Sequence, residues 1–263
     1  MEVLATARRN HARRMHVALS NLALLLLTPR NPAPPIMASS SSATTKLRAV
    51  IVPGNGDGDI EHSNWYAWMA GKLRNDERFD EVVLKNMPDP IRARRDIWLP
   101  FMRTEMGCDQ RTVVIGHSSG AVAAMRLLET DKLHGAVLVS ACHTDLGDAN
   151  ERASGYYPPS GGPWQYEAMM ANAGGNVRAA HEHELKDVLR TKSDRSVRLS
   201  LVWQIAVLHG DDDPFIPLEE AQHVFKSLGS PASLTVVKGA SHFFEPSKEL
   251  MKAVDRVAAF SHQ

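Results

Sequence analysis

Thr112-Val113-Val114-Ile115, a run of β-branched and apolar residues, is followed by Gly116-His117-Ser118-Ser119-Gly120 and then by a helical pattern from Ala121 to Leu128. Strand, sharp turn and helix in this order are the context that a G-x-S-x-G nucleophile elbow requires. A serine at the apex must adopt a strained backbone conformation, and the glycines two residues to either side leave room for the turn. We therefore interpret Ser118 as a candidate nucleophile. The alternative is a plain turn, and an acid and a histidine in suitable later loops distinguish the two.

Two backbone N–H groups are candidate donors to a substrate oxyanion. The first belongs to Ser119, because the turn opens a helix whose first N–H groups have no partner within the helix. We expect the second in the loop Pro53-Gly54-Asn55-Gly56-Asp57-Gly58, and we prefer the N–H of Asn55. A dinucleotide-binding loop is the alternative. It is disfavoured because Asp57 and Asp59 place negative charge where a pyrophosphate would lie, and no helix opens directly after the glycines.

Three carboxylates follow one another in the loop after the predicted strand 204–209, which reads Gly210-Asp211-Asp212-Asp213-Pro214. Asp213 is our choice for the acid, because Pro214 fixes the backbone after it and the apolar Phe215 and Ile216 can anchor the loop against the core. Asp212 is the fallback, and we otherwise expect Asp211 and Asp212 to be solvated. The spacing of a calcium-binding loop is not met, so we set that alternative aside.

His242 lies on the loop after the last predicted strand, which runs from Leu234 to Val237. In hydrolases with a nucleophile elbow the order along the chain is nucleophile, acid and histidine, and Ser118, Asp213 and His242 follow it. We therefore interpret His242 as the base of a serine triad. His117, inside the elbow, is expected to point away from the pocket and to pack or form hydrogen bonds.

Several further blocks accompany these motifs in a fixed order. They are Pro53-Gly54-Asn55-Gly56, Asn86-Met87-Pro88-Asp89-Pro90, Ile97-Trp98-Leu99-Pro100-Phe101, the elbow, Asp145-Leu146-Gly147-Asp148 with Glu151-Arg152-Ala153-Ser154-Gly155-Tyr156, and Asp213-Pro214-Phe215. With these blocks the chain, from about Lys46 to its C-terminus, resembles the retinoblastoma-binding protein 9 type of serine hydrolase. The resemblance implies a compact α/β-hydrolase with the triad Ser118, Asp213 and His242, acting on small ester or amide substrates.

One departure from that family concerns its protein partner. Binding to the retinoblastoma pocket is read through a Leu-x-Cys-x-Glu segment, and the corresponding stretch here is Met106-Gly107-Cys108-Asp109-Gln110. Met106 replaces the apolar leucine anchor and Gln110 removes the charge, so the resemblance does not carry this partner onto the chain.

Short β-rich runs alternate with helical patterns along the chain. This alternation predicts a three-layer α/β sandwich, in which a mostly parallel central sheet carries crossover helices on both faces. The predicted strands are Leu47 to Val52, Val82 to Leu84, Thr112 to Ile115, Ala136 to Val139, Ile205 to Leu208 and Leu234 to Val237.

Four aromatic residues are candidate walls of a substrate pocket. Trp65 closely follows the Asn55 loop, and Tyr156, Tyr157 and Trp164 lie in a polar, proline- and glycine-rich segment after a predicted strand. Segments that follow the carboxyl ends of parallel strands cover ligand sites in such folds. Packing of a loop onto the core is the alternative for the last three.

Residues 173–201 look added relative to the family. This insertion is polar and charged and contains His181-Glu182-His183-Glu184. Two histidines two positions apart face away from each other on a helix, so we expect a solvated surface and not a metal site. No cofactor or metal is expected in this protein.

Length and composition fit one enzyme domain, residues 46–263, with additions. The chain has 263 residues, 43% of them hydrophobic, which is enough for a proper core. The formal net charge is zero and the pI is near 7.2, so we expect neither nucleic acid nor an anionic membrane as partner. Cys108 and Cys142 lie in different predicted elements and favour a reducing compartment.

Residues 1–45 look like a leader and not like part of the fold. Four arginines between Arg8 and Arg14 precede an apolar run from Leu19 to Leu27. The arginines fit a transit peptide, the apolar run fits a signal peptide, and a start at Met37 would leave the segment without function. The run is too short to span a bilayer. We expect a cytoplasmic enzyme, with import into an organelle as the alternative.

The expected activity is hydrolysis of a small carboxylic ester or amide through an acyl-enzyme. The rival hypothesis is a protein-interaction module on a hydrolase scaffold without catalysis, because a fold alone does not guarantee activity.

Overall fold

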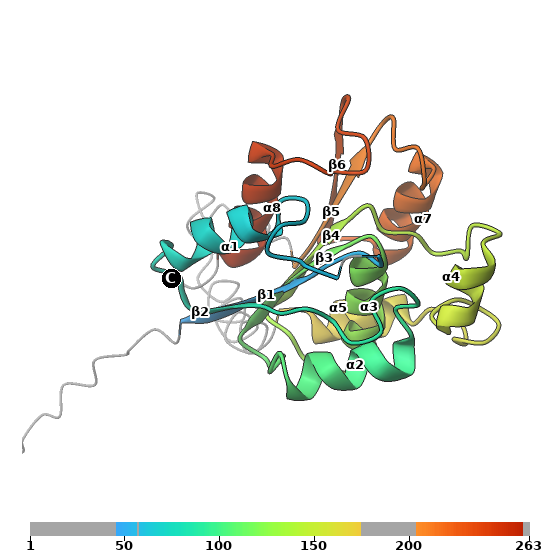
Figure 1. Cartoon of the computed structure of the whole chain (residues 1–263), viewed down its shortest axis with the longest axis horizontal. Coiled ribbons are helices and arrows are strands. Elements are labelled where there is room, and N and C mark those ends of the chain that lie inside the picture. The colour runs from blue at the N-terminus through green and yellow to red at the C-terminus, as the bar shows by residue number, and fades with distance from the viewer. Residues whose placement is uncertain (1–45, 57, 175–203, 260–263) are drawn as a thin grey trace, which may run out of the picture. The chain divides into compact units, whose positions relative to one another are not determined.

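The computed structural model describes residues 46–56, 58–174 and 204–259, all within one unit, residues 43–263. Its strands form a sheet of six in the order β2-β1-β3-β4-β5-β6, and every neighbouring pair is parallel (Figure 1). The strands are β1 (Leu47–Val52), β2 (Phe79–Leu84), β3 (Thr112–His117), β4 (Gly135–Val139), β5 (Ile205–Gly210) and β6 (Ala232–Val237). Each overlaps a predicted strand, which confirms the predicted α/β class.

Helices cover both faces of this sheet. They are α1 (Tyr66–Arg74), α2 (Arg95–Thr104), α3 (Ser119–Leu128), α4 (Ala149–Ser154), α5 (Tyr166–Asn172), α7 (Leu218–Leu228) and α8 (Lys248–Ala258). Helices α1 and α8 lie on one face, and α2, α3, α5 and α7 lie on the other (Figure 1). The buried side chains of each group belong to a separate core cluster. The three predicted layers are therefore present.

Strand residues supply the two cores alternately, as the period of two in a strand requires. Along β3, Val114 faces the core of α2, α3, α5 and α7, whereas Val113 and Ile115 face the core of α1 and α8. All residues of β3, β4 and β5 are buried, because a parallel sheet covered on both faces leaves no solvated side at its centre.

The order of the strands creates a switch point beside Ser118. The chain leaves β1 towards β2 on one side and then returns to place β3 on the other side of β1. In open parallel sheets, ligands bind in the crevice outside the carboxyl ends of the strands at such a point. The carboxyl end of β1 leads to Gly54 and Asn55, and that of β3 leads to Ser118.

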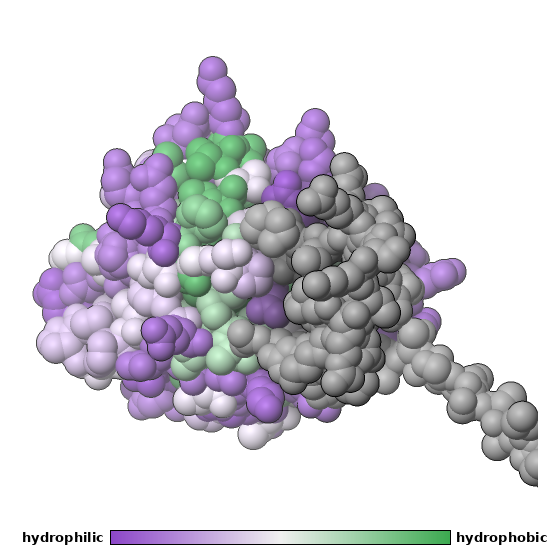
Figure 2. Space-filling view, turned by 180° about the vertical axis from the view of Figure 1, so that it is seen from behind, coloured by the Kyte–Doolittle hydropathy of each residue, from purple (hydrophilic) through white to green (hydrophobic). Residues whose placement is uncertain are grey.

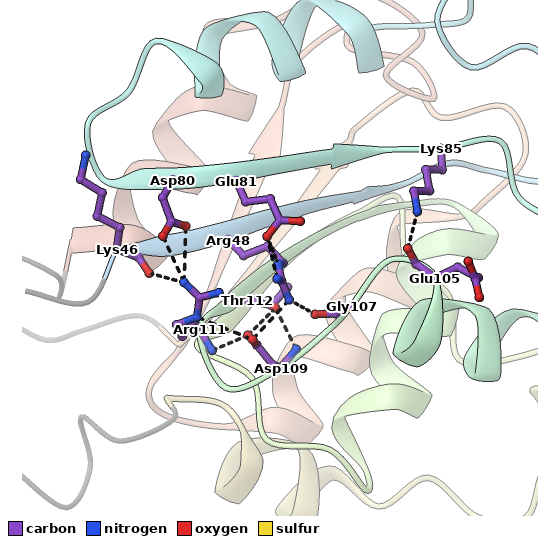
Figure 3. A network of polar contacts seen from close by, with 10 residues as sticks. All are labelled: Lys46, Arg48, Asp80, Glu81, Lys85, Glu105, Gly107, Asp109, Arg111 and Thr112. Carbon is purple, nitrogen blue, oxygen red and sulfur yellow. Dashed lines mark hydrogen bonds and ion pairs between the residues drawn. The ribbon is translucent and has the colours of Figure 1, made fainter.

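The amino ends of β1, β2 and β3 are joined by a network of charged side chains (Figure 3). Arg48 contacts Glu81 at 2.6 Å, Asp109 at 3.2 Å and the carbonyl oxygen of Gly107. Met106 is only 1% exposed. The segment that corresponds to the retinoblastoma-binding motif is thus held against β1 near the amino ends of the strands, whereas Ser118 lies at the carboxyl end of β3.

Two sequence predictions lie outside the described residues: the leader 1–45, and the insertion 173–201 beyond Gly174, which includes the His181 to Glu184 run. Within the described ranges, no helix has the length and apolar character needed to cross a bilayer. The same ranges contain no group of three or more His, Cys, Asp or Glu residues suited to a metal ion.

Candidate active site

Ser118 stands at the apex of a strained turn between β3 and α3. Its backbone has φ 54° and ψ −123°, a conformation that non-glycine residues rarely adopt. A Cβ on Gly116 would stand 2.6 Å from the carbonyl carbon of Gly120, and one on Gly120 would stand 2.8 Å from that of Val52. Both positions therefore require glycine, because the neighbours are backbone atoms that cannot turn aside.

The loop after β1 lies directly against this turn. A Cβ on Gly54 would stand 3.3 Å from the Cβ of Ser118. The N–H of Gly54 donates to the hydroxyl of Tyr66 at 3.0 Å, and that of Gly56 donates to the carbonyl of Pro90 at 2.8 Å. Between them, the N–H of Asn55 is left without a hydrogen-bond partner among the described residues, and so is the N–H of Ser119. Both predicted donors line one pocket with Ser118.

Asp213 and His242 meet across the ends of β5 and β6. Oδ2 of Asp213 lies 2.7 Å from Nδ1 of His242, and its Oδ1 accepts the backbone N–H groups of Phe215 and Ile216, each at 3.0 Å. Burial raises the pKa of Asp213, but the hydrogen bond and charge of His242 and the two backbone donors outweigh it, so the pKa lies below its ordinary value. The carboxylate is ionised at neutral pH and therefore accepts from His242.

The other two carboxylates of the triplet hold the histidine loop. Asp212 accepts the backbone N–H of Ser241 at 2.8 Å, and Asp211 accepts that of Gly239 at 2.8 Å. Both residues are exposed, as predicted, and these two hydrogen bonds are an addition that the sequence did not indicate. Their acceptors fix a loop in which Ser241 has φ 50° and Phe243 has φ 53°, so three consecutive carboxylates together position His242.

The pocket in front of Ser118 has a volume of about 660 Å³. Ser118 and His242 both line it, and no hydrogen bond joins the Ser118 hydroxyl to the His242 ring in the described part of the chain. Such bonds are often long before substrate binds. The lining residues are Gly54, Asn55, Asn64, His117, Ser118, Ser119, Cys142, Leu146, Asp148, Asn150, Glu151, Tyr157, Phe215, Ile216, His242 and Phe244.

One wall of the pocket is a hydrogen-bonded polar group. Glu151 accepts from Nδ2 of Asn55 at 3.1 Å and from the hydroxyl of Tyr157 at 2.9 Å. The Tyr157 hydroxyl also lies 3.2 Å from Sγ of Cys142. Burial raises the pKa of Glu151 above its ordinary value, and the hydrogen bonds from Tyr157 and Asn55 only partly offset this. Glu151 was not predicted as a site residue, although it lies in one of the blocks that carry the family resemblance.

An aromatic rim lies on the other side, around His242. The ring centroids of Phe215 and Phe244 lie 5.2 Å and 5.5 Å from that of His242. Phe215 is 61% exposed and Phe244 is 44% exposed. Phe215 was predicted to anchor its loop against the core, but the structure places it at the pocket mouth, and Ile216, 4% exposed, provides the anchor.

Of the four aromatic residues predicted as pocket walls, only Tyr157 lines the pocket. Trp65 is fully buried, and its ring lies 5.0 Å from that of Tyr66 and 5.7 Å from that of His117, in the core behind the turn. The predicted role of Trp65 was therefore wrong, because α1 packs on the face of the sheet away from the opening.

Tyr156 and Trp164 also lie away from the pocket and hold the segment after β4 onto the core. The carbonyl of Tyr156 accepts from Nε of Arg126 at 2.8 Å. The guanidinium of Arg126 lies 3.7 Å from the centroid of Trp164, whose Nε1 donates to the carbonyl of His143 at 2.9 Å. For these two residues the alternative of loop packing is correct, and a buried arginine is its centre.

Comparison with known proteins identifies the family of this chain. The family model described as serine hydrolase matches residues 49–248. Serine hydrolase RBBP9 of Rattus norvegicus is 44% identical over 181 residues, which make up 69% of this chain and 80% of the rat protein.

Two solved structures show a similar fold. The ydeN gene product of B. subtilis has a TM-score of 0.59 at 19% identity, over 82% of this chain and 100% of that one. TT1662 of Thermus thermophilus has a TM-score of 0.52 at 14% identity, over 83% of this chain and 90% of that one. At these identities the likeness concerns the fold alone. Together with the family match, it shows that this chain has the α/β-hydrolase fold and belongs to the serine hydrolase family.

Proposed function

We propose that this protein hydrolyses small carboxylic esters or amides through an acyl-enzyme, with Ser118 as nucleophile, His242 as base and Asp213 as the acid that orients it. The observation that carries the proposal is the arrangement around Ser118. The N–H groups of Asn55 and Ser119, which have no hydrogen-bond partner in the described part of the chain, line the same pocket as Ser118. An imidazole held by a buried carboxylate lines it too.

The tautomer of His242 follows from its hydrogen bond to Asp213. The ionised Asp213 can only accept, so Nδ1 of His242 carries the hydrogen and Nε2 is left with a free lone pair. A neutral imidazole in this tautomer removes the proton from Ser118 as the hydroxyl oxygen attacks the substrate carbonyl. The imidazolium that forms is stabilised by the Asp213 charge.

The tetrahedral intermediate places its negative oxygen between the N–H groups of Asn55 and Ser119. Each such donor contributes about 3 kcal/mol to lowering the barrier in related hydrolases. Collapse of the intermediate expels the alcohol or amine, to which His242 returns the proton. Water, activated by the same imidazole, then attacks the acyl-enzyme and releases the acid from Ser118.

The pocket favours a small substrate that joins polar and apolar parts. Its volume of about 660 Å³ is typical of sites for small organic molecules. One wall carries Glu151 and Tyr157, and the other carries Phe215 and Phe244. This arrangement supports a small-molecule partner.

A non-catalytic interaction module remains the second candidate. Figure 2 shows apolar residues gathered in a strip beside hydrophilic side chains, on the face opposite to that of Figure 1. Exposed apolar residues are common on enzymes, so this strip alone indicates no partner. The segment of the retinoblastoma-type motif is packed against Arg48, which gives no support to that partner.

Labelling with a fluorophosphonate probe and hydrolysis of p-nitrophenyl acetate test the proposal. Ser118→Ala should abolish labelling and lower kcat roughly 10⁶-fold, with an unchanged circular dichroism spectrum. Ser233→Ala is the matched control, because this hydroxyl in β6 does not line the pocket and has no hydrogen-bond partner among the described residues. A folded wild-type protein that never labels would favour the interaction module, and turnover that persists in Ser118→Ala would reject the nucleophile.

A further inference from the structure

A buried chain of hydrogen bonds runs behind the active site and joins three of its loops. The N–H of Gly54 lies 3.0 Å from the hydroxyl oxygen of Tyr66, and that oxygen lies 2.7 Å from Nδ1 of His117. Nε2 of His117 lies 2.8 Å from the backbone carbonyl oxygen of His242. Tyr66 is fully buried and His117 is 2% exposed, so these contacts are shielded from water.

The direction of each hydrogen bond is determined by chemistry. The carbonyl oxygen of His242 can only accept, so Nε2 of His117 carries a hydrogen. The pKa of His117 is lowered to about 3, chiefly by burial and then by the nearby His242. The ring is therefore neutral, and its Nδ1 accepts the hydroxyl hydrogen of Tyr66. The oxygen of Tyr66 then accepts from the N–H of Gly54, and it also accepts from Nδ2 of Asn64 at 3.2 Å.

This series of hydrogen bonds reaches the backbone next to the reacting groups. Gly54 precedes Asn55, whose N–H is a proposed oxyanion donor, and His117 precedes Ser118. At its other end, Nε2 of His117 binds the backbone carbonyl of His242 itself. The residues on either side of His242 have positive φ angles, a strained conformation that persists only where neighbouring contacts hold it.

We propose that Tyr66 and His117 are positioning residues that fix the His242 backbone and the Asn55 N–H relative to Ser118. His242 is then held at two points, with Asp213 on its ring and His117 on its carbonyl. The proposal rests on the hydrolase mechanism above, since it describes how that site is kept in register. Tyr66 does not line the pocket, whereas His117 lines it, and in this proposal both act through the groups they hold.

The neutral state of the His117 ring also suits its role in positioning His242. Its ring centroid lies 4.9 Å from that of His242, and the other titratable groups around it are Asp213 and Tyr66. A positive charge on His117 would oppose the imidazolium that forms on His242 during the reaction. A fixed neutral donor supplies the hydrogen bond without that repulsion.

Four variants test the proposal by kcat and KM for p-nitrophenyl acetate, each corrected for the fraction of sites that a fluorophosphonate titrates. Tyr66→Phe removes only the hydroxyl, and His117→Leu removes both bonds of the imidazole. His117→Gln keeps a donor and an acceptor. Tyr166→Phe is the control, because this half-buried tyrosine lies on α5 and does not line the pocket.

We expect Tyr66→Phe to lower kcat per titrated site roughly 10- to 100-fold, with KM changed by less than about twofold. His117→Leu should lower kcat at least as much, and His117→Gln should recover part of the loss. The Tyr166→Phe control should keep the wild-type kcat. If His117→Leu does not fold, Tyr66→Phe still decides the matter.

The contrary result is equally clear. Tyr66→Phe and His117→Gln that melt at lower temperature but keep the wild-type kcat per titrated site would overturn the proposal, because purely structural residues change only the amount of folded enzyme. That outcome leaves the mechanism intact as long as wild type labels and Ser118→Ala does not.

Discussion

Replacement of Asp213 by asparagine changes the site by only one group, an oxygen for an NH₂. The side-chain oxygen of the new residue is expected to stay with the N–H groups of Phe215 and Ile216, because both can only donate. The NH₂ group then faces Nδ1 of His242, at the 2.7 Å contact that Oδ2 now makes. Nδ1 must become an acceptor, which moves the ring hydrogen to Nε2.

A histidine with its hydrogen on Nε2 cannot accept the proton of Ser118. The same tautomer reversal in another serine hydrolase lowers kcat about 10⁴-fold, which corresponds to about 5 kcal/mol of barrier. We expect a similar loss here at pH 7, with KM little changed. Stopped-flow or steady-state hydrolysis of p-nitrophenyl acetate measures it.

Asp212→Asn is the matched control for this substitution. Asp212 accepts a single N–H, from Ser241, and an amide oxygen can accept it equally well. We expect Asp212→Asn to keep kcat within roughly fivefold of wild type. If Asp213→Asn keeps more than a tenth of the activity while Asp212→Asn loses most of it, the fallback residue Asp212 is the acid and the assignment of Asp213 is wrong.

Three further predictions concern the pocket wall, the turn and the leader. Glu151→Gln should gain thermal stability relative to wild type as the pH rises above 4.5. The pKa of Glu151 is raised in the folded state, so the native state binds more protons than the unfolded state and wild type loses stability with rising pH. Melting temperatures at pH 4 and pH 7 measure this difference, and a relative gain by wild type would contradict it. Gly120→Ala should lose about 1–3 kcal/mol of unfolding free energy in a urea titration and react more slowly with the fluorophosphonate, because its Cβ would meet the Val52 backbone. Gly71→Ala is the control and should change neither quantity, because a Cβ there has nothing within 4 Å. Residues 1–45 fused to a fluorescent protein should leave it cytoplasmic by microscopy, and import into an organelle would show that the leader is a targeting peptide.

The sequence was most informative where local geometry constrains residue type. Only glycine fits at positions 116 and 120, where a Cβ would meet backbone, and this requirement made the turn visible without coordinates. The strands were equally visible, because the two buried faces of β3, β4 and β5 demand continuous apolar runs. The preference for Asp213 over its neighbours came from the rigid proline after it.

The remaining features depend on contacts between distant parts of the chain. Trp65 and Tyr157 are both aromatic and follow predicted loops, yet one packs in the core behind the turn and the other lines the pocket. The difference arises from the face of the sheet to which each connection crosses, which no local pattern encodes. Glu151 and Asn55 are 96 residues apart, and Tyr66 and His117 are 51 apart. Their partnerships appear only when the strands are in register.

The most direct test of the central claim is the location of the acyl group during turnover. The protein is quenched in acid during hydrolysis of a p-nitrophenyl ester, digested, and analysed by mass spectrometry. We expect one acylated peptide, with the added mass on Ser118. Acylation of a different residue, or sustained turnover with no adduct on the peptide that contains residues 116–120, would contradict it.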